Sequence, residues 1–108
     1  MTRGYMGKIL WVDLNEGKLR EEALDEETGR KFLGGYGLGS RTLFKHQKAG
    51  IDPLGPENIF GLVTGMLTGT PAITGNRYVA VGKSPLTGGW GDANSGGNIK
   101  RKHCKDIL

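Results

Sequence analysis

The residues that could do chemistry are concentrated between Gly65 and Gly97, where glycine and small hydroxyl side chains are frequent. Loops of this kind can point several backbone N–H groups at one anion. Arg77 adds a guanidinium, whose planar fork of donors suits a phosphate. Asn94 adds an amide and a backbone carbonyl, and it stands just before Ser95 and a pair of glycines. The pattern is suited to an anion-binding surface, although composition alone favours a loop-rich surface whose arginine forms an ion pair.

Two shorter glycine motifs do not predict nucleotide binding. The sequence Gly-Lys-Ser at residues 82–84 resembles the end of a phosphate-binding loop, but Arg77 stands where that loop needs its first glycine. The run Gly-Tyr-Gly-Leu-Gly at residues 35–39 has Ser40 where a dinucleotide fingerprint has its last glycine. It also follows a predicted helix, whereas the fingerprint follows a strand. The run at residues 34–39 is instead expected to be a bend that leads into the second helix.

The composition limits what the chain can be. It has 108 residues, 20 of them glycine, which is enough for one small domain and leaves no room for two cores. Cys104 is its single cysteine, so an internal disulfide and a four-cysteine cluster are both impossible, and a reducing, cytoplasmic setting is favoured. No apolar run approaches the roughly 18 residues of a membrane-spanning helix. These counts exclude secreted disulfide scaffolds, membrane spans and large self-contained enzymes.

The net charge of +4 is concentrated at the C-terminal end. Residues 98–108 carry four basic side chains and one acidic one, which accounts for +3 of that charge. A small basic nucleic-acid-binding domain is therefore one alternative. A short basic segment is more often a solvated terminus, so we expect no nucleic-acid partner.

The order of predicted elements indicates an α+β fold. An N-terminal β-hairpin is followed by two short helices, and glycine-rich loops and strands complete the chain. Asp25 is expected to cap the N-terminus of the first helix, and the glycine at position 34 is expected to end it. The predicted ranges are strands at 8–14, 18–24, 59–64 and 77–81 and helices at 26–33 and 40–48, with loops at 65–76 and 84–97.

Several strings, in order, resemble the N-terminal domain of the aldehyde ferredoxin oxidoreductase family, the archaeal and bacterial tungsten-pterin enzymes. The resemblance covers roughly residues 4–97. The strings that carry it are YMGKILWVDL at 5–14, KFLGGYGL at 31–38, DPLGPEN at 52–58, GMLTGTP at 65–71, TGNRY at 74–78, KSPLTG at 83–88 and ANSGG at 93–97.

The resemblance implies a platform beneath a tungsten (or molybdenum) bis-pterin cofactor. Members of this family of anaerobes oxidise aldehydes to carboxylic acids and pass the electrons through a 4Fe-4S cluster to ferredoxin. By resemblance, Arg77 lies beside the pterin phosphates, and the backbone carbonyl of Asn94 helps to hold the magnesium that bridges them. Ser95, Gly96 and Gly97 would form the loop where backbone approaches the pterin.

The sequence departs from the family pattern after Gly97. We expect a partial family domain over residues 1–97 and a basic tail unlike the family over residues 98–108. The cluster cysteines, the second pterin site and the acid–base residues of the family are missing, so no catalytic residue is assigned and the chain alone is expected to be inactive. A truncated or degenerate oxidoreductase domain fits this pattern. The alternative is an accessory or split cofactor-binding subunit that another chain completes.

Overall fold

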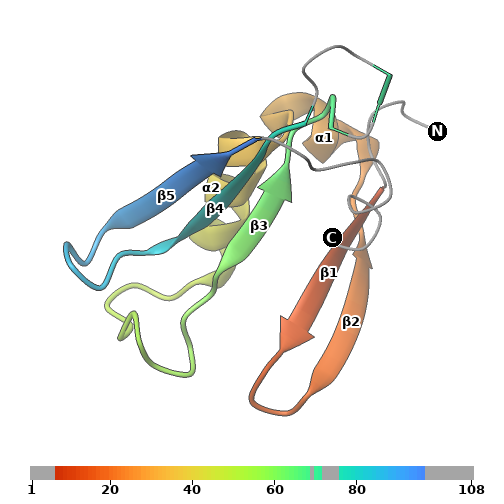
Figure 1. The fold of residues 1–108 in the computed structure, drawn as a ribbon. Coiled ribbons are helices and arrows are strands. Elements are labelled where there is room, and N and C mark those ends of the chain that lie inside the picture. Colours follow the sequence, from red (N-terminus) through yellow and green to blue (C-terminus); the bar gives the residue numbers. More distant parts are fainter. Residues whose placement is uncertain (1–6, 69, 72–75, 97–108) are drawn as a thin grey trace.

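The computed structural model describes residues 7–68, 70–71 and 76–96, which form a hairpin, two helices and a three-stranded sheet (Figure 1). The predicted α+β class is confirmed. The predicted boundary between residues 97 and 98 lies outside the described residues. The elements are β1 (Lys8–Asp13), β2 (Lys18–Ala23), α1 (Glu26–Phe32), α2 (Gly35–His46), β3 (Gly61–Thr64), β4 (Tyr78–Lys83) and β5 (Trp90–Ser95).

The hairpin of β1 and β2 is fixed by its turn and by one aromatic side chain. Asp13 Oδ1 accepts hydrogen bonds from the backbone N–H groups of Asn15 and Glu16, and Gly17 supplies the positive φ of 68° that the turn requires. Trp11 lies on the side of the hairpin toward α2, where its ring meets the His46 ring edge-on with centroids 4.8 Å apart. This contact joins the hairpin to the rest of the fold.

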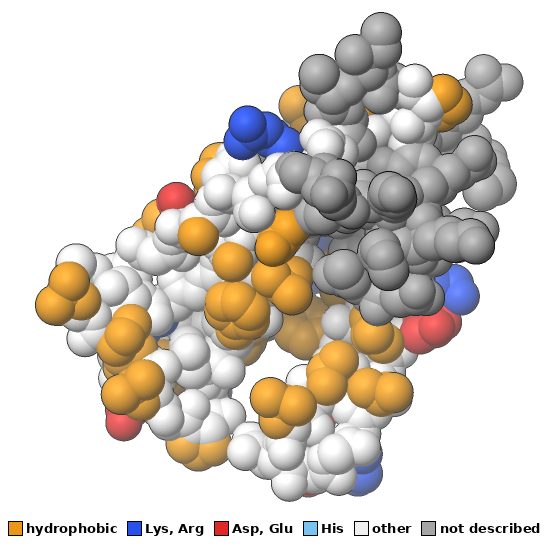
Figure 2. Space-filling view, in the orientation of Figure 1, with side chains coloured by type: hydrophobic (Ala, Val, Ile, Leu, Met, Phe, Trp, Pro, Cys, Tyr) orange, Lys and Arg blue, Asp and Glu red, His pale blue; other side chains and the backbone are white. Residues whose placement is uncertain are grey.

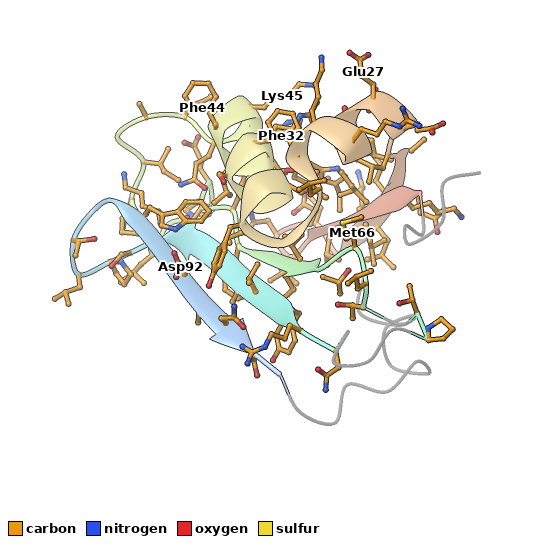
Figure 3. All side chains as sticks on the ribbon, turned by 90° about the horizontal axis from the view of Figure 1, so that it is seen from above. Glu27, Phe32, Phe44, Lys45, Met66 and Asp92 are labelled. Carbon is orange, nitrogen blue, oxygen red and sulfur yellow. The ribbon has the colours of Figure 1, made fainter. Side chains whose placement is uncertain are left out.

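The sheet has the order β3-β4-β5 and is antiparallel throughout. Figure 3 shows both helices on one side of it. The residues of β3 and β4 that point toward α2 form the core, because alternate side chains of a strand point to the same face. The core cluster comprises Leu43, Val79 and Val81, with Ile59 and Val63 packed against it.

Two glycines of α2 let the helix approach its neighbours. A Cβ at Gly39 would lie 3.1 Å from Cγ2 of Val81, and one at Gly37 would lie 2.3 Å from the carbonyl oxygen of Phe32. The first contact is tight and the second is impossible without backbone movement. The glycine run at residues 35–39, expected to be a bend, is therefore helical and packs α2 against the sheet and α1.

The structure differs from the predicted elements most clearly in three places. The second helix starts at Gly35, five residues before the predicted start, because the glycine run is helical. Residues 90–95, expected within a loop, form β5 against β4. Leu33, with φ of 62° and ψ of −66°, is the residue of positive φ at the end of α1, where the following glycine was expected. Asp25 is at the predicted N-cap, but its side chain makes no capping hydrogen bond.

Few hydrophobic side chains are buried among the residues that the structure describes. Leu43, Ile51, Val79 and Val81 are the hydrophobic residues classed as buried among those described, whereas many large apolar side chains remain exposed. No helix in the described ranges has the length and apolar character needed to cross a membrane.

Candidate cofactor-binding site

Arg77 and Asn94 meet at one end of the three-stranded sheet. Arg77 directly precedes β4, and Asn94 is the fifth residue of β5. The register pairs Val79 with Asn94, so Arg77 and Asn94 are diagonal neighbours on one face of the sheet. Nη1 of Arg77 donates a hydrogen bond of 2.9 Å to Oδ1 of Asn94. The structure thus brings together the two polar side chains that the sequence analysis placed in a phosphate site.

Gly96 completes this side of the site. A Cβ at Gly96 would lie 3.6 Å from Cγ and 3.9 Å from Cζ of Arg77, which is ordinary van der Waals contact. A larger side chain there would grow beside the guanidinium, so glycine leaves that side of it open. Ser95 alternates with Asn94 along β5 and therefore points to the opposite face of the sheet. Gly97 lies outside the described residues.

The backbone of Arg77 is held by the turn that follows β3. Its carbonyl oxygen accepts a hydrogen bond of 2.6 Å from Oγ1 of Thr68 and one of 3.3 Å from the backbone N–H of Gly65. These two bonds fix where the arginine side chain starts. The sequence analysis included Thr68 in the glycine-rich stretch but missed this positioning role. The sequence signal for this role is a threonine in a turn beside the end of a strand, which is a weak signal because threonine is common in turns.

The charge of Arg77 is not balanced by a carboxylate within the described ranges 7–68, 70–71 and 76–96. The ion pairs found there involve Lys8, Lys18, Arg30 and Lys31. Asp92 lies on the same face of β5 as Asn94, but its Oδ2 accepts a 2.5 Å hydrogen bond from Nε1 of Trp90. The simple ion pair that composition alone allowed is therefore not formed by these residues, and an exposed guanidinium faces solvent.

The part of the chain that the structure describes contains no group of three or more His, Cys, Asp or Glu residues that could hold a metal ion. A cation here would need backbone carbonyls together with the oxygens of an anionic ligand. Magnesium is commonly held in that way, with a phosphate ligand and few protein oxygens.

The chain matches the family model described as "Aldehyde ferredoxin oxidoreductase, N-terminal domain" over residues 9–105. This match extends beyond residue 97, where we predicted that the family domain ends and the basic tail begins. That boundary stays a prediction.

The relatives that this chain matches are several times longer than its 108 residues. The tungsten-containing aldehyde ferredoxin oxidoreductases of Pyrococcus horikoshii and Pyrococcus furiosus are 51% and 47% identical to it over 94 residues. Those residues are 87% of this chain but only 16% of each relative. The "Aliphatic sulfonate oxidoreductase, WOR-like subunit" of Pyrococcus furiosus is 42% identical over 88 residues, which are 79% of this chain and 14% of that protein.

A solved structure shares the fold. It is described as the active site complex BamBC of benzoyl coenzyme A reductase in complex with 1,5-dienoyl-CoA. The TM-score is 0.80 at 30% sequence identity, and the match covers 87% of this chain and 14% of the other.

Proposed function

Because the chain belongs to the aldehyde ferredoxin oxidoreductase family, we propose that it supplies part of the N-terminal platform for a tungsten (or molybdenum) bis-pterin cofactor. The observation that carries the proposal is the Arg77–Asn94 pair, in which the guanidinium is oriented but keeps its charge. The proposed role is to bind the phosphate end of the cofactor.

The residues present fit such a group. A guanidinium has five N–H donors, and the bond to Asn94 occupies one of them on Nη1, so the others can meet phosphate oxygens. Gly96 leaves the space beside Arg77 free of a side chain. Two phosphates held close together repel one another, and a guanidinium with a divalent cation offsets that repulsion. In this proposal the backbone carbonyl of Asn94 contributes to magnesium, and Ser95, Gly96 and Gly97 border the pterin.

The chemistry of oxidation would come from the cofactor and from the rest of the protein. When bound, tungsten supplies the electron-accepting centre for oxidation of an aldehyde to a carboxylic acid. The residues of this chain bind and orient the cofactor, and we assign none of them a proton transfer. With the single cysteine Cys104, the chain cannot hold a 4Fe-4S cluster through four cysteines, so electron transfer to ferredoxin belongs to residues elsewhere.

The chain spans only 16% of the length of the tungsten enzymes it resembles, so we propose that it is inactive by itself. The exposed apolar side chains fit a domain whose remaining part would cover them; a split subunit completed by another chain is the alternative.

Binding of magnesium pyrophosphate, the simplest mimic of paired phosphates, tests the role of Arg77. We expect isothermal titration calorimetry to show roughly tenfold or greater loss of affinity for Arg77→Met, because a charge-assisted hydrogen bond is removed. Arg30→Met is the matched control, because Arg30 lies on α1 in an exposed ion pair with Glu26. Equal affinity for the wild type and Arg77→Met would reject the proposed phosphate site.

A further inference from the structure

The three-stranded sheet has an uncovered apolar face. Val63, Val79 and Val81 point toward α2, so the residues that alternate with them point away from it. Leu62 lies on this second face with 42% of its surface exposed, and Phe60, just before β3, is 67% exposed. Figure 2 shows hydrophobic side chains gathered on this side of the sheet.

The hairpin has a matching apolar face on the same side of the molecule. Trp11 faces α2, so its neighbours Leu10 and Val12 lie on the face directed away from that helix. Val12 pairs with Leu19 across the hairpin, and these side chains are 52% and 70% exposed. Two apolar faces, from segments far apart in the sequence, thus point away from α2 together.

A hollow separates these two faces. In Figure 1, β1 is the hairpin strand nearer to β3, and among the described residues each of the two pairs with a strand on its far side only. Neither hairpin strand has a Cα within 8 Å of a Cα in β3, β4 or β5, whereas paired strands lie about 4.8 Å apart. Figure 2 shows the space between them, bordered by hydrophobic side chains.

The two strands on either side of the hollow have no charged residue in their middle. The outer strand β2 has the sequence KLREEA, with four charged residues, whereas the other outer strand, β5, has the sequence WGDANS, with one charged residue, Asp92, in its middle. Charged side chains are a common means of keeping an exposed edge from pairing. β3 reads GLVT, without a charge, and β1 reads KILWVD, charged only at its ends. The inner edges lack this protection.

We propose that the β1 and β3 edges receive an extended β-segment, with alternating apolar side chains, from the part of the family's protein that lies beyond the matched N-terminal segment. This inference rests on the proposed function. The family relatives supply the argument for the occupant, because the matched residues make up only 16% of their length. The added strand would pair with both edges through its backbone, and its apolar side chains would cover the exposed faces of the hairpin and the sheet.

Co-expression with a complementing polypeptide tests this inference. The probe is the Pyrococcus horikoshii relative without its matched N-terminal segment, expressed in a host not supplied with tungsten so that cofactor binding plays no part. We expect a complex of the two chains to purify together. Amide hydrogen exchange should then slow roughly tenfold or more in β1 and β3 and stay unchanged in β2 and at the outer edge of β5.

Two variants and a control locate the contact. Val12→Lys and Leu62→Lys place a charge on the apolar faces beside the hollow and should weaken the complex at least about tenfold. Phe44→Lys is the control, because Phe44 is 93% exposed and points away from the sheet (Figure 3), so this change should leave the complex intact. Circular dichroism of each variant confirms that it is folded before its binding is compared.

The remaining outcomes overturn the inference. These are the absence of a complex with the wild-type chain, protection confined to the helices or the outer strands, and equal weakening by Phe44→Lys. Concentration-dependent dimerisation of the 108-residue chain alone, with protection of β1 and β3, would show a second copy as the occupant. Each of these results leaves pyrophosphate binding at Arg77 untouched, so the two proposals fail separately.

Discussion

Nη1 of Arg77 lies 2.9 Å from Oδ1 of Asn94, and the pairing of β4 with β5 brings these residues together across 17 positions of sequence. A carboxamide oxygen orients a guanidinium without neutralising it, which a carboxylate would do. The site therefore combines a fixed direction for the arginine with a positive charge that an anion can use.

Replacing Asn94 by Asp tests whether this charge matters. The new carboxylate would form an ion pair with Arg77, so pyrophosphate affinity in the absence of magnesium should fall roughly tenfold or more. Asn94→Ala keeps both the backbone and the charge of Arg77 and should lose less affinity. Calorimetric titration of the two variants provides the comparison, and tighter binding by Asn94→Asp than by the wild type would contradict this account.

Gly37→Ala tests the contact between the two helices. The new Cβ would lie 2.3 Å from the carbonyl oxygen of Phe32, so α1 and α2 would have to separate. We expect a loss of about 2 kcal/mol or more in the free energy of unfolding, despite the better helix propensity of alanine. Urea unfolding measures the loss, and Gly89→Ala, whose Cβ would come no closer than 3.8 Å to another residue, is the control. An unchanged stability of Gly37→Ala would mean that the helices do not meet as described.

Val81→Ala tests where the core is. Val81 is 1% exposed and lies in the central strand, so shortening it should cost roughly 2 kcal/mol of unfolding free energy. Val12→Ala makes the same chemical change at a half-exposed position of the hairpin and should cost about 0.5 kcal/mol or less. Urea midpoints of the two variants decide between them, and a larger cost at Val12 would place the core elsewhere.

His46→Ala tests how the hairpin is attached. The Trp11 ring loses its edge contact with His46 in this variant, so the hairpin should become more mobile and the indole more hydrated. A red shift of Trp11 fluorescence is the expected signal, measured in a Trp90→Phe background because Trp90 is the other tryptophan. An unshifted spectrum would show that other contacts hold the hairpin.

The elements with strong local signals were predictable from the sequence. Strand-favouring residues at 8–14 and the turn at 15–17 predicted the hairpin, and the acidic first turn of α1 predicted its start. β5 was missed because Trp90–Ser95 is composed largely of small polar residues with low strand propensity. Pairing with β4 overrides that propensity. The early start of α2 was missed because glycines disfavour a helix, and their benefit appears only through contacts with Val81 and Phe32.

The candidate site was predictable in part. Residue chemistry singled out Arg77 and Asn94, and the family resemblance gave them roles. Their direct hydrogen bond depends on the β4–β5 register, which could not be foreseen while β5 was expected to be a loop. The position of Thr68 against the Arg77 carbonyl also depends on how the turn after β3 folds back. The sequence shows which side chains of the site can bind an anion, whereas their positions relative to one another depend on the pairing of β4 with β5.

The content of tungsten and molybdenum in the purified protein tests the central claim most directly. The wild-type chain and Arg77→Met should be prepared without oxygen from a host supplied with both metals, together with the complementing polypeptide, and shown to be folded. We predict near-stoichiometric metal with the wild type and a large loss with Arg77→Met. A folded wild-type complex that contains neither metal would contradict the role of this chain as a cofactor platform.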